Sequence, residues 1–228
     1  MLIKDFKDLP AYMQNEEVKK YFDYLQNKRM QLLFKRLFDM TAAIILCVLL
    51  SPIFLFISIW IKLDSKGPVF YRQERITQYG KKFKIFKFRT MVVNADKKGT
   101  LVTVDNDTRI TNVGKKIRKS RLDEIPQLFN VIKGEMTFVG TRPEVKKYVD
   151  CYSNEMKGTL LLPAGITSLA SIKYKDEDEI ISYYIKDGAS VDKVYIEKIL
   201  PEKMHWNIEY ISSFSFRKDL WICLKTLV

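Results

Sequence analysis

Two adjacent acids, Asp123 and Glu124, are the residues best suited to chemistry. Arg118 and Arg121 precede the pair, and Arg142 follows it. A carboxylate can attack phosphorus to form an acyl phosphate, a second carboxylate can hold Mg²⁺, and guanidinium groups bind phosphate oxygens. The arrangement therefore indicates Mg²⁺-assisted phosphoryl transfer. Acid pairs also occur at the start of helices that do no chemistry, so the dipeptide alone leaves both interpretations open.

The elements that must position the acid pair are short. Helices are predicted over Asn112–Ser120 and Leu122–Ile132, and a strand over Met136–Val139. Because proline is tolerated in the first turn of a helix, Pro126 predicts that the second helix begins at Leu122 or Asp123. The acids then lie at a helix N-terminus, where free N–H groups and a partial positive charge favour carboxylates and phosphate.

Paired strands are predicted upstream of the acid pair. The predicted elements are two strands, the turn between them and a polar loop that follows: residues 68–76, 82–90, 78–80 and 92–108. In the second strand aromatic and cationic residues largely alternate, which turns Phe83 and Ile85 inward and leaves Lys87 and Arg89 to project elsewhere. These two cations either bind substrate or belong to a solvated basic face.

An uncharged apolar run, Thr41–Ile61, contains Ser51 and Pro52 at its middle. As a straight helix it would be about 30 Å long, which matches the hydrocarbon thickness of a bilayer. Proline removes a backbone donor and kinks a helix, and a serine hydroxyl can bond a freed carbonyl. Because cations flank both ends equally, no crossing direction is favoured. A re-entrant hairpin and a straight single-pass anchor both remain open on these residues.

The overall composition narrows the class of protein. The formal charge is +12, and a basic chain with an apolar anchor fits anionic lipid headgroups and phosphorylated substrates better than nucleic acid. Three cysteines lie far apart in the sequence, which argues against a disulfide framework or a zinc site and fits a reducing compartment. His205 is the only histidine, which excludes multi-histidine metal sites, and its place between Met204 and Trp206 in a predicted helix favours structural packing over a catalytic triad.

The chain divides into three parts. Residues 1–34 are predicted to be a helical lead-in at the surface, residues 35–64 the membrane helix, and residues 65–228 the catalytic domain. Near the C-terminus, Glu197–Ile211 and Phe216–Val228 are predicted to be amphipathic helices. The first is expected to pack into the core, and the second, which contains a tryptophan between cations, to lie at the membrane interface.

The ordered set of motifs resembles the bacterial sugar transferase family, the monotopic polyprenyl-phosphate glycosyl-1-phosphate transferases, over about residues 33–228. Any one motif is weak, but the set in this order is specific. The motifs are Lys35-Arg36-Leu37-Phe38-Asp39, Ser51-Pro52, Gly67-Pro68-Val69-Phe70 with Gln73 and Arg75, Lys87-Phe88-Arg89-Thr90-Met91, Asp107-Thr108-Arg109-Ile110-Thr111 with Gly114 and Arg118, Leu122-Asp123-Glu124-Ile125-Pro126-Gln127-Leu128 with Asn130-Val131, and Val139-Gly140-Thr141-Arg142-Pro143 after Gly134 and Met136.

The resemblance implies an α/β, mainly helical, monotopic enzyme on the cytoplasmic face of the bacterial cytoplasmic membrane, anchored by a re-entrant helix broken at Ser51 and Pro52. Such an enzyme transfers a sugar 1-phosphate from a nucleotide sugar, here a UDP-sugar, to a polyprenyl phosphate such as undecaprenyl phosphate. UMP is released, and glycoconjugate assembly begins. The expected partners are these two substrates and inner-membrane lipids, with no nucleic acid; a homo-oligomer stays open.

By position, the resemblance makes Asp123 the nucleophile, which forms a covalent phosphosugar intermediate, and it associates Glu124 with the cofactor Mg²⁺. Four residues match basic motif positions and are predicted to bind substrate: Lys87, Arg89, Arg118 and Arg142.

The chain departs from the family pattern at three places. Thr141 replaces a proline, Thr77 replaces a glycine, and Leu169-Ala170-Ser171 replaces a Trp-Gln sequence after the family loop Pro163–Thr167. The last change leaves the donor sugar undefined. Two other classes also stay open: a direct sugar transferase that releases a nucleoside diphosphate, and a catalytically inactive membrane adaptor with a basic domain.

Overall fold

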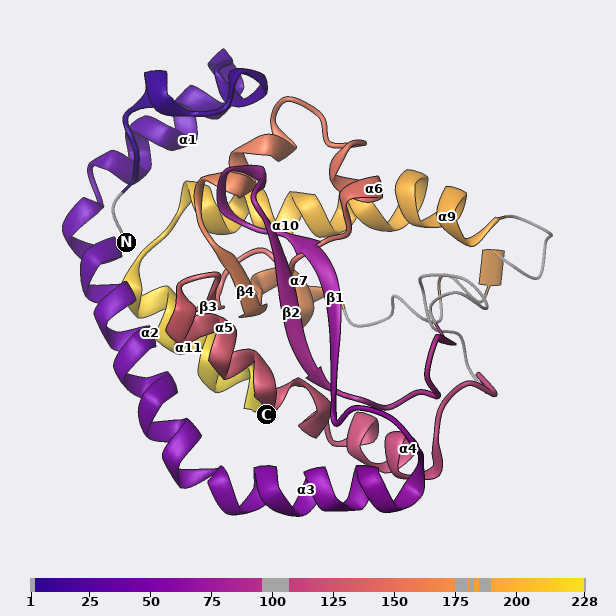
Figure 1. Cartoon of the computed structure of the whole chain (residues 1–228). Coiled ribbons are helices and arrows are strands. Elements are labelled where there is room, and N and C mark those ends of the chain that lie inside the picture. Colours follow the sequence, from indigo (N-terminus) through magenta and orange to yellow (C-terminus); the bar gives the residue numbers. More distant parts are fainter. Residues whose placement is uncertain (1–2, 96–106, 175–179, 181–182, 185–189, 228) are drawn as a thin grey trace.

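The computed structural model describes residues 3–95, 107–174, 180, 183–184 and 190–227, and it is mainly helical with two small sheets (Figure 1). This agrees with the predicted mainly helical α/β class. The α-helices are α1 (Glu16–Gln26), α2 (Arg29–Leu49), α3 (Ser51–Asp64), α4 (Asn112–Lys119), α5 (Leu128–Lys133), α6 (Lys146–Val149), α7 (Leu169–Lys173), α9 (Val191–Val194), α10 (Leu200–Ser212) and α11 (Phe216–Leu227). The strands are β1 (Phe70–Ile76), β2 (Lys82–Phe88), β3 (Met136–Val139) and β4 (Ala164–Thr167).

Helices α2 and α3 form the left and lower border of Figure 1 and are bent by 61° relative to each other. Pro52 lies in the first turn of α3, where its missing N–H costs no helical hydrogen bond, and the Ser51 hydroxyl donates to the Val48 carbonyl at 2.8 Å. The predicted break is therefore confirmed. Within the described ranges no single helix is long and apolar enough to cross a bilayer, whereas this bent pair together reaches that length and composition.

Strands β1 and β2 pair with each other, as predicted; the pairing is antiparallel, with Tyr71 opposite Lys87. The alternation in β2 directs Phe83 and Ile85 inward, at 6% and 4% exposure. Strand β2 packs against the 3-10 helix η5 (Leu122–Gln127), whose first turn contains the acid pair. The predicted helix Leu122–Ile132 is thus two segments, η5 followed by α5, which ends at Gly134 with a positive φ of 81°. Of the predicted loop 92–108, residues 96–106 lie outside the described residues.

Strands β3 and β4 pair in parallel. β3 is confirmed as a strand, and the Pro163–Thr167 stretch, which the resemblance gave only as a loop, contains β4. The backbones approach so closely at Gly165 that an added Cβ would lie 2.2 Å from the Gly140 nitrogen. Glycine at that position therefore allows the segment that carries Arg142 to lie against β4.

The N-terminal segment is more than the surface lead-in that the sequence predicts. Asn15 caps α1 by accepting from the Val18 N–H at 3.0 Å, and the apolar residues Val18, Phe22 and Leu25 share the buried side of the helix. They join the largest core cluster together with residues of α10. The sequence predicted a helical segment here but not its burial, which depends on partners more than a hundred residues away.

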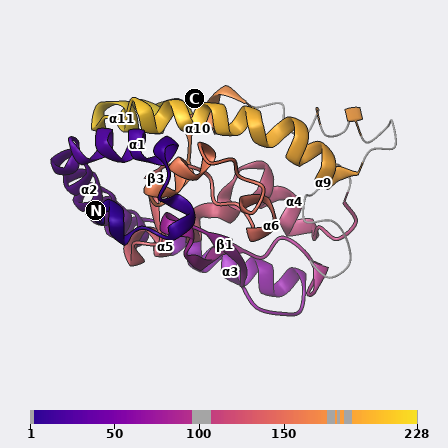
Figure 2. The ribbon, with the colours of Figure 1, turned by 90° about the horizontal axis from the view of Figure 1, so that it is seen from above.

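The C-terminal helices α9, α10 and α11 lie along one side of the molecule, opposite α3 and β1 (Figure 2). Helix α10 buries Met204 and Tyr210, as expected for core packing. Helix α11 leaves Trp221 and Leu224 exposed, at 42% and 66%. Its Phe216 ring meets rings of α2 edge to face, so the apolar surface of α11 adjoins that of α2.

Candidate active site

The acid pair lies at a sharp reversal between α4 and η5. Arg121 adopts a left-handed conformation, with φ 53°, and its carbonyl accepts the Glu124 N–H at 3.2 Å. Pro126 lies inside the 3-10 helix, where the tighter turn and the missing early hydrogen bonds accommodate it. Asp123 and Glu124 therefore lie in the first turn of η5, as the sequence predicts, although the helix is of the 3-10 type.

Glu124 is held between two cations. Its Oε1 accepts from Lys87 Nζ of β2 and from Arg142 Nη2 of the loop after β3, each at 2.7 Å. Burial alone would raise the pKa of Glu124, but the charges and hydrogen bonds of Arg142 and Lys87 lower that pKa well below its ordinary value. Glu124 is therefore a carboxylate at neutral pH. It gathers two of the cations that the sequence predicts for substrate binding.

Asp123 differs from its neighbour because, among the described residues, its side chain has no hydrogen bond or ion pair to another side chain. Burial and the charge of Glu124 raise its pKa, while the charges of Lys87 and Arg118 lower it, and the net direction is upward. The carboxylate is only partly shielded from solvent. A half-buried carboxylate next to fixed cations is arranged as a nucleophile toward an anionic phosphorus centre would be.

The predicted cations are not all in one group. Lys87 and Arg142 contact Glu124, and Arg118, at the end of α4, acts on Asp123 through its charge. Arg89 is 5% exposed, and its guanidinium donates to the carbonyls of Lys66 and Ser65 at 2.5 and 2.7 Å, at the C-terminal end of α3. These contacts direct Arg89 toward the helix end and away from the acid pair, because the side chain caps free carbonyls there.

Sequence reasoning assigned no role to Asn130, although it belongs to a quoted motif. Its side chain is fully buried: Oδ1 accepts from the Phe86 N–H at 2.9 Å, and Nδ2 donates to the Lys84 carbonyl at 3.0 Å. Asn130 thereby fastens α5 to β2 next to Lys87. The available signal in the sequence was an amide residue among apolar neighbours, shortly after the acid pair in the same motif.

Arg75 and Glu144 were also missed as members of the site. Arg75 donates to the Pro143 carbonyl at 3.2 Å, directly after Arg142, and its Nη1 lies 3.8 Å from the Glu144 carboxylate. The available signals were the Gln-x-Arg motif in β1 and the acid that directly follows Arg142-Pro143. Only the fold shows that these two segments meet.

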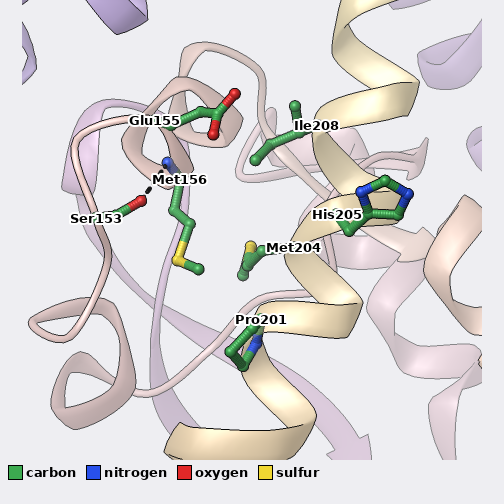
Figure 3. Close-up of a pocket in the computed structure, with 7 residues that line it drawn as sticks. All are labelled: Ser153, Glu155, Met156, Pro201, Met204, His205 and Ile208. Carbon is green, nitrogen blue, oxygen red and sulfur yellow. Dashed lines mark hydrogen bonds between the residues drawn. The ribbon is translucent and has the colours of Figure 1, made fainter.

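A small hollow elsewhere contains none of the predicted site residues (Figure 3). The hollow lies between α10 and the segment before η6 (Met156–Leu161), where the Ser153 hydroxyl accepts from the Met156 N–H at 3.2 Å. Its lining residues are Ser153, Glu155, Met156, Pro201, Met204, His205 and Ile208. His205 is exposed rather than packed inside, which corrects the sequence-based expectation.

The bent apolar helix pair is thus joined to a small domain in which Glu124 lies between two cations, directly after Asp123. The chain belongs to the bacterial sugar transferase family, because the sequence model of that family matches residues 30–228. It is 36% identical over 196 residues, 85% of this chain, to UDP-N-acetylgalactosamine-undecaprenyl-phosphate N-acetylgalactosaminephosphotransferase of Aeromonas hydrophila. It is 34% identical over 200 residues, 86% of this chain, to UDP-glucose:undecaprenyl-phosphate glucose-1-phosphate transferase of Klebsiella pneumoniae.

The chain spans 42% and 39% of the length of those two relatives. A relative of comparable size is the uncharacterized sugar transferase EpsL of Bacillus subtilis, 35% identical over 196 residues, which are 86% of each chain. The matched region thus contains the bent helix pair, the acid pair and the cations around it.

Proposed function

We propose that this protein transfers a sugar 1-phosphate from a UDP-sugar to undecaprenyl phosphate and so begins the assembly of a glycoconjugate. Family membership supports the proposal, as do the two relatives whose names state such transfers. The observation that carries it is the pairing of a partly exposed Asp123 with a Glu124 that two cations hold ionised.

The first step is attack of an Asp123 Oδ atom on the sugar-linked phosphorus of the donor. The new bond joins that oxygen to phosphorus, the bond to the bridging oxygen breaks, and UMP leaves. Lys87, Arg142 and Arg118 are positioned to bind the non-bridging oxygens and to stabilise charge on the leaving phosphate. The product of the step is an acyl phosphate that joins the phosphosugar to Asp123.

In the second step an oxygen of undecaprenyl phosphate attacks the same phosphorus. The bond from Asp123 to phosphorus breaks, the carboxylate is regenerated, and the lipid carries a diphosphate-linked sugar. Two displacements at one phosphorus atom allow a water-soluble donor and a lipid acceptor to bind in turn.

The donor set fits Mg²⁺. Mg²⁺ binds through one or two carboxylates together with substrate phosphates, and Glu124 is ionised with Oε2 not engaged by Lys87 or Arg142. Within the described part of the chain no group of three acids, cysteines or histidines is placed to hold a metal alone, so the diphosphate would complete the ligand set. When bound, Mg²⁺ neutralises charge on the diphosphate. Glu124 would hold it beside Asp123.

The bent helix pair is proposed to enter and leave the bilayer on its cytoplasmic side, so that both chain ends share that face. The 61° bend at Ser51 and Pro52 supports this, as does the apolar surface on both arms. The exposed apolar residues of α2 and α3 are Met30, Leu33, Phe34, Leu37, Phe38, Ile44, Ile45, Val48, Leu49, Ile53, Leu55, Phe56, Ile59 and Leu63.

The test is to identify the released nucleotide. The full chain in nanodiscs with undecaprenyl phosphate and Mg²⁺ is incubated with a panel of UDP-sugars, and UMP is expected with at least one. Release of UDP would instead indicate a direct transferase, and no release with any donor would indicate an inactive adaptor.

A second arm of the test concerns the nucleophile. Asp123→Asn should abolish UMP release, because an amide is not a carboxylate nucleophile. Asp150→Asn is the matched control, since Asp150 is exposed and, among the residues that the structure describes, forms its ion pair with Lys146. With labelled donor and no acceptor, the label should be recovered on the peptide that contains Asp123. Substantial turnover by Asp123→Asn would remove Asp123 from this role.

A further inference from the structure

Glu144 is a buried acid that the proposed reaction does not use. It directly follows Arg142 and Pro143 and is only 6% exposed. A buried carboxylate is costly unless it is paired, so its partners show what it stabilises.

The partners of Glu144 come from three separate segments. The Tyr195 hydroxyl of the π-helix η7 (Tyr195–Ile199) donates to Oε1 at 2.5 Å, and Lys203 Nζ of α10 lies 3.4 Å from the same atom. Arg75 Nη1 of β1 lies 3.8 Å from Oε2, and the Glu144 carbonyl accepts the Ile76 N–H at 2.9 Å. Glu144 thus joins β1 to the C-terminal helices next to the loop that carries Arg142.

Arg75 links Glu144 to the site. Its Nη1 donates to the Pro143 carbonyl, while Nε and Nη2 donate to Gln73 Oε1 at 3.0 and 2.7 Å. The guanidinium is therefore fixed from one side by Gln73 and from the other by the loop. Burial lowers the pKa of Arg75 and the charge of Arg142 lowers it further, whereas the charge of Glu144 raises it. Arg75 and Arg142 repel each other, and Glu144 supplies the opposing charge.

We infer that Glu144 is a positioning residue for Arg142. Its carboxylate keeps the Arg75 guanidinium in place, and Arg75 in turn fixes the Pro143 carbonyl that directly follows Arg142. The Arg142 guanidinium is then held against Glu124 at 2.7 Å. The two arginines, Arg142 and Arg75, thus lie between two acids, Glu124 on one side and Glu144 on the other. The role of Arg142 in binding the donor diphosphate, and with it this inference, rests on the proposed function.

The experiment compares Glu144→Gln, Arg142→Lys and the double variant in the nanodisc assay. Because Glu144 acts through Arg142, Glu144→Gln should lower kcat/KM for the UDP-sugar about tenfold in the otherwise unaltered protein. In the Arg142→Lys background, where the fork is already lost, the same change should cost less than about twofold. UDP affinity in the presence of Mg²⁺, measured by calorimetry, should show the same non-additivity without requiring turnover.

Tyr148→Phe is the matched control. Tyr148 stacks on Tyr195 at 4.3 Å between ring centroids but donates its hydroxyl to Asp192, so the variant perturbs the same region without touching the Glu144 charge. It should leave UDP affinity unchanged even if the melting temperature falls.

The inference is overturned if the losses in kcat/KM caused by Glu144→Gln and by Arg142→Lys multiply in the double variant. It is also overturned if Tyr148→Phe lowers UDP affinity as much as Glu144→Gln does when the two variants have equal melting temperatures. Absence of turnover in the unaltered protein would overturn the proposed function alone. The UDP titrations then decide the inference, which fails if Glu144→Gln leaves UDP affinity unchanged.

Discussion

Lys35 is the residue whose replacement tests how α2 is joined to the rest of the domain. Its Nζ lies 2.6 Å from Asp219 Oδ2 of α11 and 3.5 Å from Asp39 Oδ2 of α2, and all three side chains are 5% exposed or less. Tyr210 donates to Asp219 at 2.7 Å, and Thr137 of β3 donates to Asp39. One lysine therefore lies between two buried acids that belong to different elements.

Lys35→Met removes the only cation of this cluster among the described residues and leaves two carboxylates facing each other. Breaking a buried ion pair by removing one partner costs about 3–5 kcal/mol. That cost shifts the unfolding equilibrium by a factor of about one hundred to several thousand. Lys35→Met/Asp219→Asn removes one of the unpaired acids and should recover part of the loss.

The measurement is unfolding in mixed micelles, followed by tryptophan fluorescence. Lys20→Met is the matched control, because Lys20 is exposed and, within the described part of the chain, its ion pair is with Glu17, so the variant should leave unfolding unchanged. The reasoning is refuted if Lys35→Met loses no more stability than Lys20→Met.

The cluster also predicts a pH signature. Burial raises the pKa of Asp219, while Lys35 lowers it, so the pKa of Asp219 rises further in Lys35→Met. A carboxyl whose folded pKa lies above its unfolded pKa binds more protons in the folded state, and lowering the pH then favours folding. The stability deficit of Lys35→Met should therefore shrink as the pH falls from 8 toward 5. A deficit that grows over this range contradicts the assignment.

Three further predictions concern the bend and the site. Arg89→Met should lower the melting temperature by about 5 °C, because carbonyls at the end of α3 lose their donor, and should leave KM for the donor unchanged; a raised KM at an unchanged melting temperature would return Arg89 to substrate binding. Pro52→Leu should straighten the break between α2 and α3. The test uses Lys66→Cys as a reporter in a protein that lacks its native cysteines, and this cysteine should then react with an impermeant maleimide from the opposite membrane face. Labelling from an unchanged side argues against a bend set by proline. Because the pKa of Glu124 is lowered in the folded state, the stability that its ionisation contributes is complete above the ordinary pKa of 4.5 and is lost as the pH falls below it. Glu124→Gln should therefore lower the melting temperature at pH 7, and the melting temperatures of the variant and the unaltered protein should converge in acid. A constant difference between them at all pH values would contradict this.

Local chemistry made part of the fold predictable. Pro52 and Ser51 act on their own helix, so the break could be placed from the sequence. The alternation in Lys82–Phe88 gave the inward side of β2, and Gly134 marked the end of α5. In each case the determining contacts lie within a few residues.

Long-range pairing was less accessible. Parallel pairing of β3 with β4 depends on a crossover, and a four-residue strand carries little periodic signal. The burial of α1 likewise depends on α10, far along the chain.

The cations of the site could be predicted as residue types, but not which of them come together, because their contacts are long-range. Lys87 and Arg142 were predicted as cations, and the structure brings both to Glu124. Arg89 carries the same charge only two residues after Lys87, but it lies beyond the end of β2 and meets the end of α3. Glu144 could not be chosen from the sequence, because an acid after a proline has many uses and its partners lie on three other segments.

The Arg36 side chain fastens one arm of the bent helix pair to the domain. Arg36 lies on α2 and donates to the carbonyls of Val131 and Ile132 at 2.6 and 3.0 Å, which ties α2 to the last turn of α5. The far end of α3 is tied as well, because Arg89 donates to the Lys66 and Ser65 carbonyls there. The bent pair is therefore anchored to the domain on both sides of its bend, and a change in the length of either arm would strain one of the two ties.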